Sequence, residues 1–225
     1  MTITKLFNRS TLAAGAIALI SSLCFGKVAI AETKMFELND WSILGSGNYT
    51  DNYLSLSSNS PDVSDTKMEN VLGLSSGTLD DISGVNATAG ALAYTTIEAK
   101  TGDIINFNWF FKTKDYLPYD DFSFWSISNT ATLLADVSMV GNKGSIYNSE
   151  SYEIVADGTY TLGFGILDGK DTAVDSFLKI KNVTQTKYVP TQTKSVPEPT
   201  SMLGLLAVGA MGASSLLKRD REQQG

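Results

Sequence analysis

Hydrophobic and polar residues alternate along the middle of the chain. In residues 105–111, large apolar residues stand at every second position and alternate with Asn106 and Asn108. The same period of two continues through Phe122 and Phe124, and it returns in residues 158–167 and 174–183. A period of two is typical of a β-strand with one buried face. We therefore predict strands over these segments and over residues 91–97, which are rich in strand-forming residues.

Turn-forming residues separate these segments at intervals of eight to twelve positions, as in Lys100-Thr101-Gly102-Asp103, Asp157-Gly158 and Asp168-Gly169. Short strands at this spacing predict an all-β fold, an antiparallel β-sandwich. One short helix is expected beside the strands. Ser64 or Asp65 can cap its N-terminus, apolar residues follow at helical spacing, and Gly73 suits its C-terminal stop.

The first end of the chain is typical of a secretory signal peptide. Lys5 and Arg9 precede an apolar stretch at residues 12–25, and Ala29-Ile30-Ala31 follows. A basic region, a short apolar stretch and an A-x-A site are the three parts of such a peptide. We expect signal peptidase to cleave after Ala31, with Ala29 and Ala31 as the small residues of the site.

The second apolar stretch, residues 200–217, contains no charged residue. A helix of this length covers about 27 Å, enough for the apolar core of a bilayer. Lys218, Arg219 and Arg221 follow at once, and they should stay on the cytoplasmic side and leave the middle of the chain outside. The sequence therefore predicts a transmembrane helix; a buried helix rich in small residues is the alternative.

These features divide the chain into a signal peptide (1–31), a β-sandwich domain (32–183), a Thr- and Pro-rich spacer (184–199) and a transmembrane segment with a basic tail (200–225). Residues 32–199 contain 22 Asp or Glu, 11 Lys and no Arg, a net charge of −11. This charge argues against nucleic acid as a partner. The chain has no His, and Cys24 in the first apolar stretch is its one Cys, so we expect no imidazole or thiol chemistry in the mature domain.

The order of motifs near the second end is specific. Val196-Pro197-Glu198-Pro199, the apolar stretch and Lys218-Arg219 follow one another over about 30 residues. This arrangement resembles the PEP-CTERM sorting signal of Gram-negative bacteria. The resemblance implies transient membrane anchoring and processing near Pro197, Glu198 and Pro199 by an exosortase, a membrane transpeptidase or protease. It also implies a final place in the cell envelope or outside the cell, in association with exopolysaccharide.

A second resemblance covers residues 68–183. It is carried by the segments 99–103, 107–111, 120–124, 133–137, 158–165 and 178–183. These segments resemble a module of cyanobacterial PEP-CTERM proteins and large bacterial adhesins. The resemblance implies a non-catalytic β-sandwich, often jelly-roll-like. Lys181 departs from the pattern, because related modules often have Asp at this position before Asn-Val.

Acidic residues crowd two of the predicted loops. Asp120 and Asp121 open one predicted strand, whereas Asp168, Asp171 and Asp175 crowd the approach to the last one. Carboxylates in flexible loops suit Ca²⁺, which takes about six to eight oxygen ligands, although their spacing is not that of an EF-hand. The alternative is that these residues form turn hydrogen bonds and keep the surface solvated. Calcium is the one cofactor that the sequence suggests.

Aromatic residues offer a second kind of site. Tyr116, Tyr119 and Trp125 lie between or within two predicted strands. Sugar rings present apolar C–H faces that stack on such side chains, and flanking Asp residues can hold the hydroxyl groups. These three residues are therefore candidates for glycan binding; a place in the core is the alternative, especially for Trp125.

Catalytic motifs are missing from the sequence. Glu98, Glu150 and Glu153 could supply paired carboxylates for glycoside hydrolysis, but none stands in a recognisable catalytic context. We therefore expect an exported, non-enzymatic protein of the envelope or extracellular matrix, adhesive or structural. A carbohydrate-binding module assisted by calcium is the second hypothesis, and a secreted hydrolase is the third.

Overall fold

A computed structural model describes residues 31–50, 52–59 and 63–189. The predictions for Ala29, Pro197, Glu198 and Pro199, and for the two apolar stretches, concern residues outside these ranges. Ala31, the first described residue, is exposed. Within the described ranges, no helix is long and apolar enough to cross a membrane.

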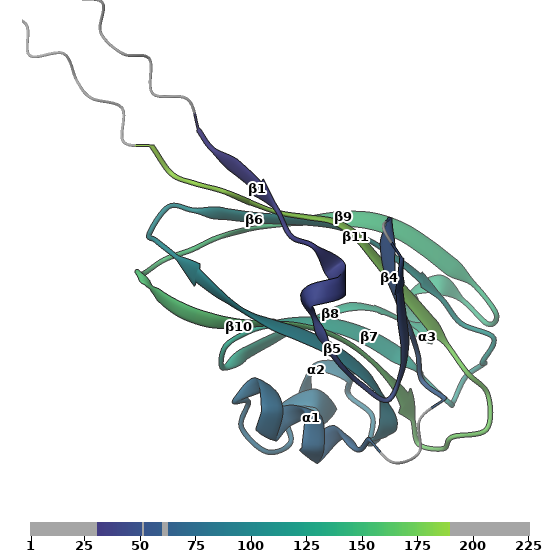
Figure 1. The fold of residues 1–225 in the computed structure, drawn as a ribbon. Coiled ribbons are helices and arrows are strands. Elements are labelled where there is room, and N and C mark those ends of the chain that lie inside the picture. Colours follow the sequence, from purple (N-terminus) through teal and green to yellow (C-terminus); the bar gives the residue numbers. More distant parts are fainter. Residues whose placement is uncertain (1–30, 51, 60–62, 190–225) are drawn as a thin grey trace, which may run out of the picture. The chain divides into compact units, whose positions relative to one another are not determined.

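The described strands form two antiparallel sheets that lie face to face (Figure 1). Sheet A contains, in spatial order, β3 (Ser46–Thr50), β4 (Tyr53–Ser57), β11 (Phe177–Thr186), β6 (Ile104–Lys112) and β9 (Ser145–Glu153), and β1 (Thr33–Met35) pairs with the end of β11. Sheet B contains β2 (Ser42–Leu44), β5 (Ala87–Ala99), β10 (Gly158–Gly169), β7 (Phe122–Ile127) and β8 (Thr130–Asp136).

The strand pairs are nested. β4 pairs with β11, β5 with β10, β6 with β9, and β7 with β8. Eight strands paired in this order and shared between two sheets form a jelly roll. The predicted antiparallel, jelly-roll-like β-sandwich is therefore confirmed.

The inner faces of the two sheets enclose the main core. Phe107, Trp109 and Phe111 of β6 are buried there, as their alternation predicts, and so are Leu178 and Ile180 of β11. The ring of Phe107 lies edge-on to Phe164 at 4.8 Å and to Trp125 at 5.5 Å between centroids. Such edge-to-face pairs add to the stabilisation from burial of apolar area.

The predicted helix is present as α1 (Asp65–Leu72). The side chain of Ser64 accepts a hydrogen bond from the backbone N–H of Lys67 at 3.3 Å, and Gly73 ends the helix with a left-handed φ of 73°. Three further short helices, which the sequence did not predict, also form: α2 (Thr78–Ser83), α3 (Val137–Val140) and the 3₁₀ helix η1 (Leu38–Asp40). Each is too short to give a helical period in the sequence.

The helices α1 and α2 cover the outer face of sheet B and enclose a second core (Figure 1). Met68 and Leu72 of α1 are buried in this core beside Phe122 and Phe124 of β7. The glycines of β10 allow the close approach. A Cβ atom on Gly163 would lie 2.5 Å from Cδ2 of Leu72, so the helix packs directly on the backbone of the strand.

Two strand ends differ from the predictions. β10 continues through Asp168 and Gly169, with an irregular register against β5 instead of the expected turn. β11 runs to Thr186, past the expected domain end at residue 183, after a register shift between Lys181 and Thr184. The first residues of the predicted spacer are thus part of sheet A, and Gln185 is buried.

Candidate functional site

The outer face of sheet A carries no helix in the part of the chain that the structure describes (Figure 1). Strand registers align its outward residues in rows across the sheet. In one row, Ser55 of β4 faces Lys179 of β11, which faces Phe110 of β6, which faces Tyr147 of β9. In the next row, Lys181 faces Asn108. We call the outward residues of β3, β4, β11, β6 and β9 the open face of sheet A.

Three aromatic rings stand among polar residues on the open face. Tyr53, Phe110 and Tyr147 line a pocket of about 350 Å³ together with Lys179 and Lys181. The ammonium group of Lys179 lies 4.8 Å from the centroid of the Tyr53 ring, and that of Lys181 lies 5.2 Å from the Tyr147 ring. The face therefore combines apolar ring surface, fixed positive charge and amide groups.

The predicted glycan residues have different surroundings. Tyr116 is exposed and Tyr119 is half-buried in the loop after β6, with their rings edge-on at 5.6 Å. Trp125 is only 6% exposed and packs on Phe107 and Tyr152 in the main core. Its ring faces are covered by neighbouring side chains, so we no longer include Trp125 among the glycan-binding residues. The alternative, a core position, describes it.

The predicted metal ligands lie at one end of the sandwich but do not form one set. Asp121 and Asp168 are buried close to Asp115, which the sequence analysis missed. Asp120 is half-buried, and its Oδ1 accepts a hydrogen bond from the backbone N–H of Ser138 in α3. Asp171 and Asp175 are half-buried in the loop after β10. We call Asp115, Asp121 and Asp168 the acidic cluster.

Hydroxyl groups next to the ends of β6 and β11 connect to the acidic cluster. Ser176 donates to Oδ2 of Asp121 at 2.6 Å, and its oxygen lies 2.9 Å from Oγ1 of Thr113. Oδ2 of Asp115 and Oδ1 of Asp168 are buried and have no hydrogen-bond partner.

The environment changes the charge of the cluster. Burial raises the pKa of Asp121 to about 8; the negative charge of Asp168 adds to this effect, and the hydrogen bond from Ser176 opposes it. Burial also raises the pKa of Asp168 to about 7, with the charges of Asp175 and Asp171 acting in the same direction. In the described residues, no three Asp or Glu side chains are arranged to hold a metal ion by themselves.

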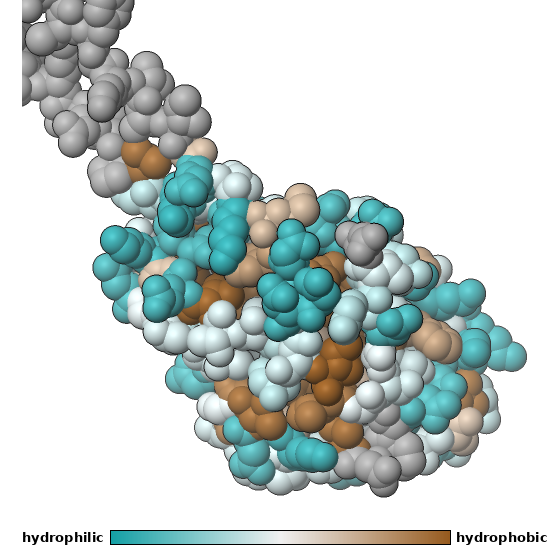
Figure 2. All heavy atoms as spheres, in the orientation of Figure 1, coloured by the Kyte–Doolittle hydropathy of each residue, from teal (hydrophilic) through white to brown (hydrophobic). Residues whose placement is uncertain are grey.

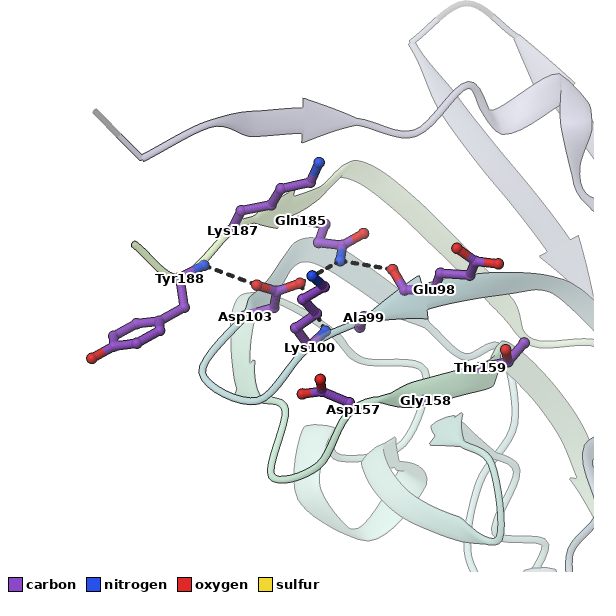
Figure 3. Close-up of a pocket in the computed structure, with 10 residues that line it drawn as sticks. All are labelled: Glu98, Ala99, Lys100, Asp103, Asp157, Gly158, Thr159, Gln185, Lys187 and Tyr188. Carbon is purple, nitrogen blue, oxygen red and sulfur yellow. Dashed lines mark hydrogen bonds between the residues drawn. The ribbon is translucent and has the colours of Figure 1, made fainter. Parts of the chain in front are cut away.

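A further pocket of about 510 Å³ lies at the opposite end, between the ends of β5 and β11 (Figure 3). Asp103 is its centre: it accepts hydrogen bonds from the side-chain amide of Gln185 at 2.8 Å and from the backbone N–H of Tyr188 at 2.8 Å. Burial alone would raise the pKa of Asp103, but the donors around it outweigh this effect and the pKa is lowered. This end pocket therefore fixes the chain where it leaves sheet A.

Asp103 and Asp157 of the end pocket have pKa values that do not suit a general acid. The pKa of Asp157 is lowered because the backbone N–H and the hydroxyl of Thr101 both donate to its Oδ1. The pKa of Asp103 is lowered too, whereas the general acid of a glycosidase needs a raised pKa. Of the glutamates considered for hydrolysis, Glu98 lines this pocket, whereas Glu150 and Glu153 lie on the edge strand β9.

Sequence reasoning missed the aromatic residues of the open face. Phe110 is the clearest case, because it stands at an outward position of β6 between Trp109 and Phe111, which point inward. A large apolar residue at a polar position of an alternating strand was the signal. Tyr53 and Tyr147 gave no such signal, because their strands β4 and β9 were not predicted.

Three comparisons with known proteins complete the description. The chain is similar to solved structures described as "CBM4 structure and function" (11% identity, 66% of this chain, 86% of the other, TM-score 0.34) and as the N-terminal cellulose-binding domain of Cellulomonas fimi β-1,4-glucanase C (10% identity, 66% and 89%, TM-score 0.33). At these TM-scores neither similarity bears on function. No curated protein sequence matches the chain significantly.

The family comparison concerns the second end of the chain. Residues 195–219 match the model of the PEP-CTERM protein-sorting motif. They include Pro197, Glu198 and Pro199, the apolar stretch 200–217, and Lys218-Arg219. The chain therefore carries a PEP-CTERM sorting motif, which implies export, transient membrane anchoring and sorting by exosortase-type machinery.

Proposed function

We propose that the mature protein is an adhesive or structural component of the cell envelope or extracellular matrix, and that it holds exopolysaccharide on the open face of sheet A. The observation that carries this proposal is the group of Tyr53, Phe110 and Tyr147 on a face without helices. Aromatic rings exposed among polar groups offer stacking surfaces to sugar rings, and the polar groups can hold hydroxyls.

The route of the protein follows from its two ends. Signal peptidase would remove residues 1–31, and an exosortase would act near Pro197, Glu198 and Pro199 after transient anchoring. The product would be a surface or extracellular protein.

The test compares two tyrosines of similar exposure. Tyr147 on the open face is 54% exposed and Tyr188 beside the end pocket is 59% exposed. We expect the full-length chain in detergent to sediment with exopolysaccharide from its own bacterium without shortening it. Tyr147→Ala with Phe110→Ala should weaken this binding, whereas Tyr188→Ala should not. No binding by the unaltered chain, or equal binding by all variants, would contradict the proposal.

The loop after β6, which contains Tyr116 and Tyr119, is tested in the same assay. Tyr116 and Tyr119 stay candidates for glycan binding, because the exposed Tyr116 and the half-buried Tyr119 lie in a loop next to Asp120. If Tyr116→Ala and Tyr119→Ala abolish sedimentation while the Phe110 and Tyr147 changes leave it intact, the glycan surface is this loop and not the open face.

We also propose that Ca²⁺ binds at the acidic cluster and stabilises this end of the sandwich. Two buried carboxylate oxygens, on Asp115 and Asp168, have no donor, and such a group needs a proton or a cation. Because two or three carboxylates supply too few ligands alone, neighbouring hydroxyl and carbonyl oxygens would have to complete the set.

Calorimetry with millimolar CaCl₂ tests the calcium proposal. We expect heat of binding and a higher melting temperature for the full-length chain. Asp168→Asn should remove both effects, whereas Asp157→Asn at the opposite end should keep them. The contrary outcome is that protonation of the carboxylates satisfies the cluster without a cation. Ca²⁺ would then have no effect, and Asp168→Asn would be at least as stable as the parent chain.

A further inference from the structure

The open face differs in charge from the rest of the domain. Three consecutive rows of outward residues cross the five strands β3, β4, β11, β6 and β9. The rows consist of Ser46, Asn48 and Thr50 on β3, Tyr53, Ser55 and Ser57 on β4, Phe177, Lys179 and Lys181 on β11, Asn108, Phe110 and Lys112 on β6, and Ser145, Tyr147 and Ser149 on β9. Lysine is the one charged residue type among them.

This distribution is unusual for so acidic a chain. Residues 32–199 have twice as many Asp and Glu as Lys, 22 against 11, so a face of this size would be expected to carry several acids. Instead, Lys112, Lys179 and Lys181 stand in adjacent rows without an acid beside them in the sheet. Among the described residues, the ion pair that forms lies elsewhere, between Lys187 and Glu32. In the described part of the chain, no Asp or Glu lies within ion-pair distance of Lys112, Lys179 or Lys181; the acid on the same face, Glu153 of β9, lies two rows beyond Lys181.

The lysines are also held in place. The ammonium groups of Lys179 and Lys181 lie over the rings of Tyr53 and Tyr147, at 4.8 Å and 5.2 Å from the centroids. A cation over an aromatic ring loses part of its freedom before a ligand arrives, which lowers the entropic cost of binding. Phe110 lies next to Lys179 in the same row. Among the residues that the structure describes, no lysine lies over its ring, so the ring offers a stacking surface between the ammonium groups of Lys179 and Lys181.

The dimensions suit a polymer. The pocket reaches from β4 to β9, across three strand spacings, or about 14 Å at the usual distance between strands. A chain molecule that crosses the sheet can meet Lys181, Lys179 and Phe110 together, and contacts on one polymer reinforce each other through effective concentration.

We infer that the open face binds an anionic polysaccharide, whose acidic groups pair with Lys179 and Lys181 while a sugar ring stacks on Phe110. This inference rests on the proposed function and specifies its ligand class. A negatively charged glycan can pair with the lysines of the open face, whereas a neutral glycan cannot. Because the pairs are exposed, salt screens them, so binding weakens as ionic strength rises.

Affinity gel electrophoresis with two polymers of one backbone tests the inference. Carboxymethylcellulose carries carboxylates, whereas hydroxyethylcellulose is neutral. We expect the full-length chain in detergent to be retarded by carboxymethylcellulose and much less by hydroxyethylcellulose. Each exposed ion pair contributes a factor of about two to five, so Lys179→Gln with Lys181→Gln should weaken binding roughly tenfold. High salt should have a similar effect.

The control variant removes two positive charges that lie off the open face. Lys67 on α1 and Lys100 at the end pocket are exposed and lie off the open face, so Lys67→Gln with Lys100→Gln should leave retardation unchanged. Equal retardation of the two double variants would overturn the inference, as would equal binding to both polymers or to neither. Equal binding to double-stranded DNA through the same two lysines would also overturn it, because the face would then take any polyanion. Failure here with intact binding of native exopolysaccharide would leave the proposed function standing.

Discussion

The outer face of sheet B is covered by α1 and α2, whereas the outer face of sheet A is open over β4, β11, β6 and β9 (Figure 1). Phe122 and Phe124 on the covered face are buried under Met68 and Leu72. On the open face the outward positions are mostly Ser, Asn and Lys, with single aromatic rings between them. The two faces thus have the same strand geometry but different side chains.

The side chains of the covered face stabilise the fold, whereas those of the open face are accessible to a ligand. Each large apolar side chain under the helices contributes roughly 1.5–3 kcal/mol by leaving water. Phe110 and Tyr147 remain in contact with water and contribute less to stability. Hydrophobic residues also reach the surface near the helices, whereas hydrophilic residues gather around β1 (Figure 2).

The largest expected effect comes from the same substitution on both faces. Phe124→Ala empties part of the core under the helices and should lower the free energy of unfolding by about 3–5 kcal/mol. Phe110→Ala should lower it by about 1 kcal/mol or less while weakening the binding of exopolysaccharide. Urea denaturation of the full-length chain in detergent measures both. Similar losses for the two variants would remove the distinction between the faces.

A smaller effect is expected from the close packing of α1 on β10. In Gly163→Ala the new Cβ would lie 2.5 Å from Cδ2 of Leu72 and 2.6 Å from Oγ of Ser126, at a cost of about 1–3 kcal/mol. Gly158→Ala in the same strand is the matched control, since its nearest neighbour would be 3.5 Å away. If thermal denaturation finds the two variants alike, the helix has room to move away from sheet B.

The smallest effect concerns Asp103, which belongs to the end pocket and to neither outer face. Its pKa is lower in the folded than in the unfolded chain, so its contribution to stability is complete above the unfolded pKa and is lost as pH falls through the folded one. Asp103→Asn should therefore lower the melting temperature at pH 7 and reduce its decline below about pH 4. Glycan binding should not change. Parallel melting curves against pH would contradict this account.

Much of the main core could be predicted because alternation reports burial directly. The inward positions of β6 and β11 follow from period two alone, and the caps of α1 follow from Ser64 and Gly73. The covered outer face of sheet B was harder to predict. In β10, Gly163 and Gly165 stand at positions where a half-buried strand would have polar residues, and only the packing of Leu72 and Phe124 against them gives the reason.

The candidate sites depend on contacts between distant segments, and these cannot be read from local pattern. Asp168 near the end of β10 lies close to Asp115 and Asp121, which belong to the loop between β6 and β7. The register shift in β11 decides that Gln185 reaches Asp103. α2 is a similar case. Its first N–H groups, on Gly77 and Leu79, donate to the carboxylate of Glu69 in α1, so a residue eight to ten positions earlier does the work of a cap.

The position of β11 has a mechanical consequence. β11 carries Lys179 and Lys181, and it is the last strand of the described residues, which end before the sorting motif at residues 195–219. It lies between β4 and β6, with β1 beside its final residues. A pull between a polymer on this strand and an anchor beyond it would run along the strand axis, and the hydrogen bonds on both edges would resist together in shear instead of opening one after another. The proposed adhesive or structural role would benefit from tension borne in this way.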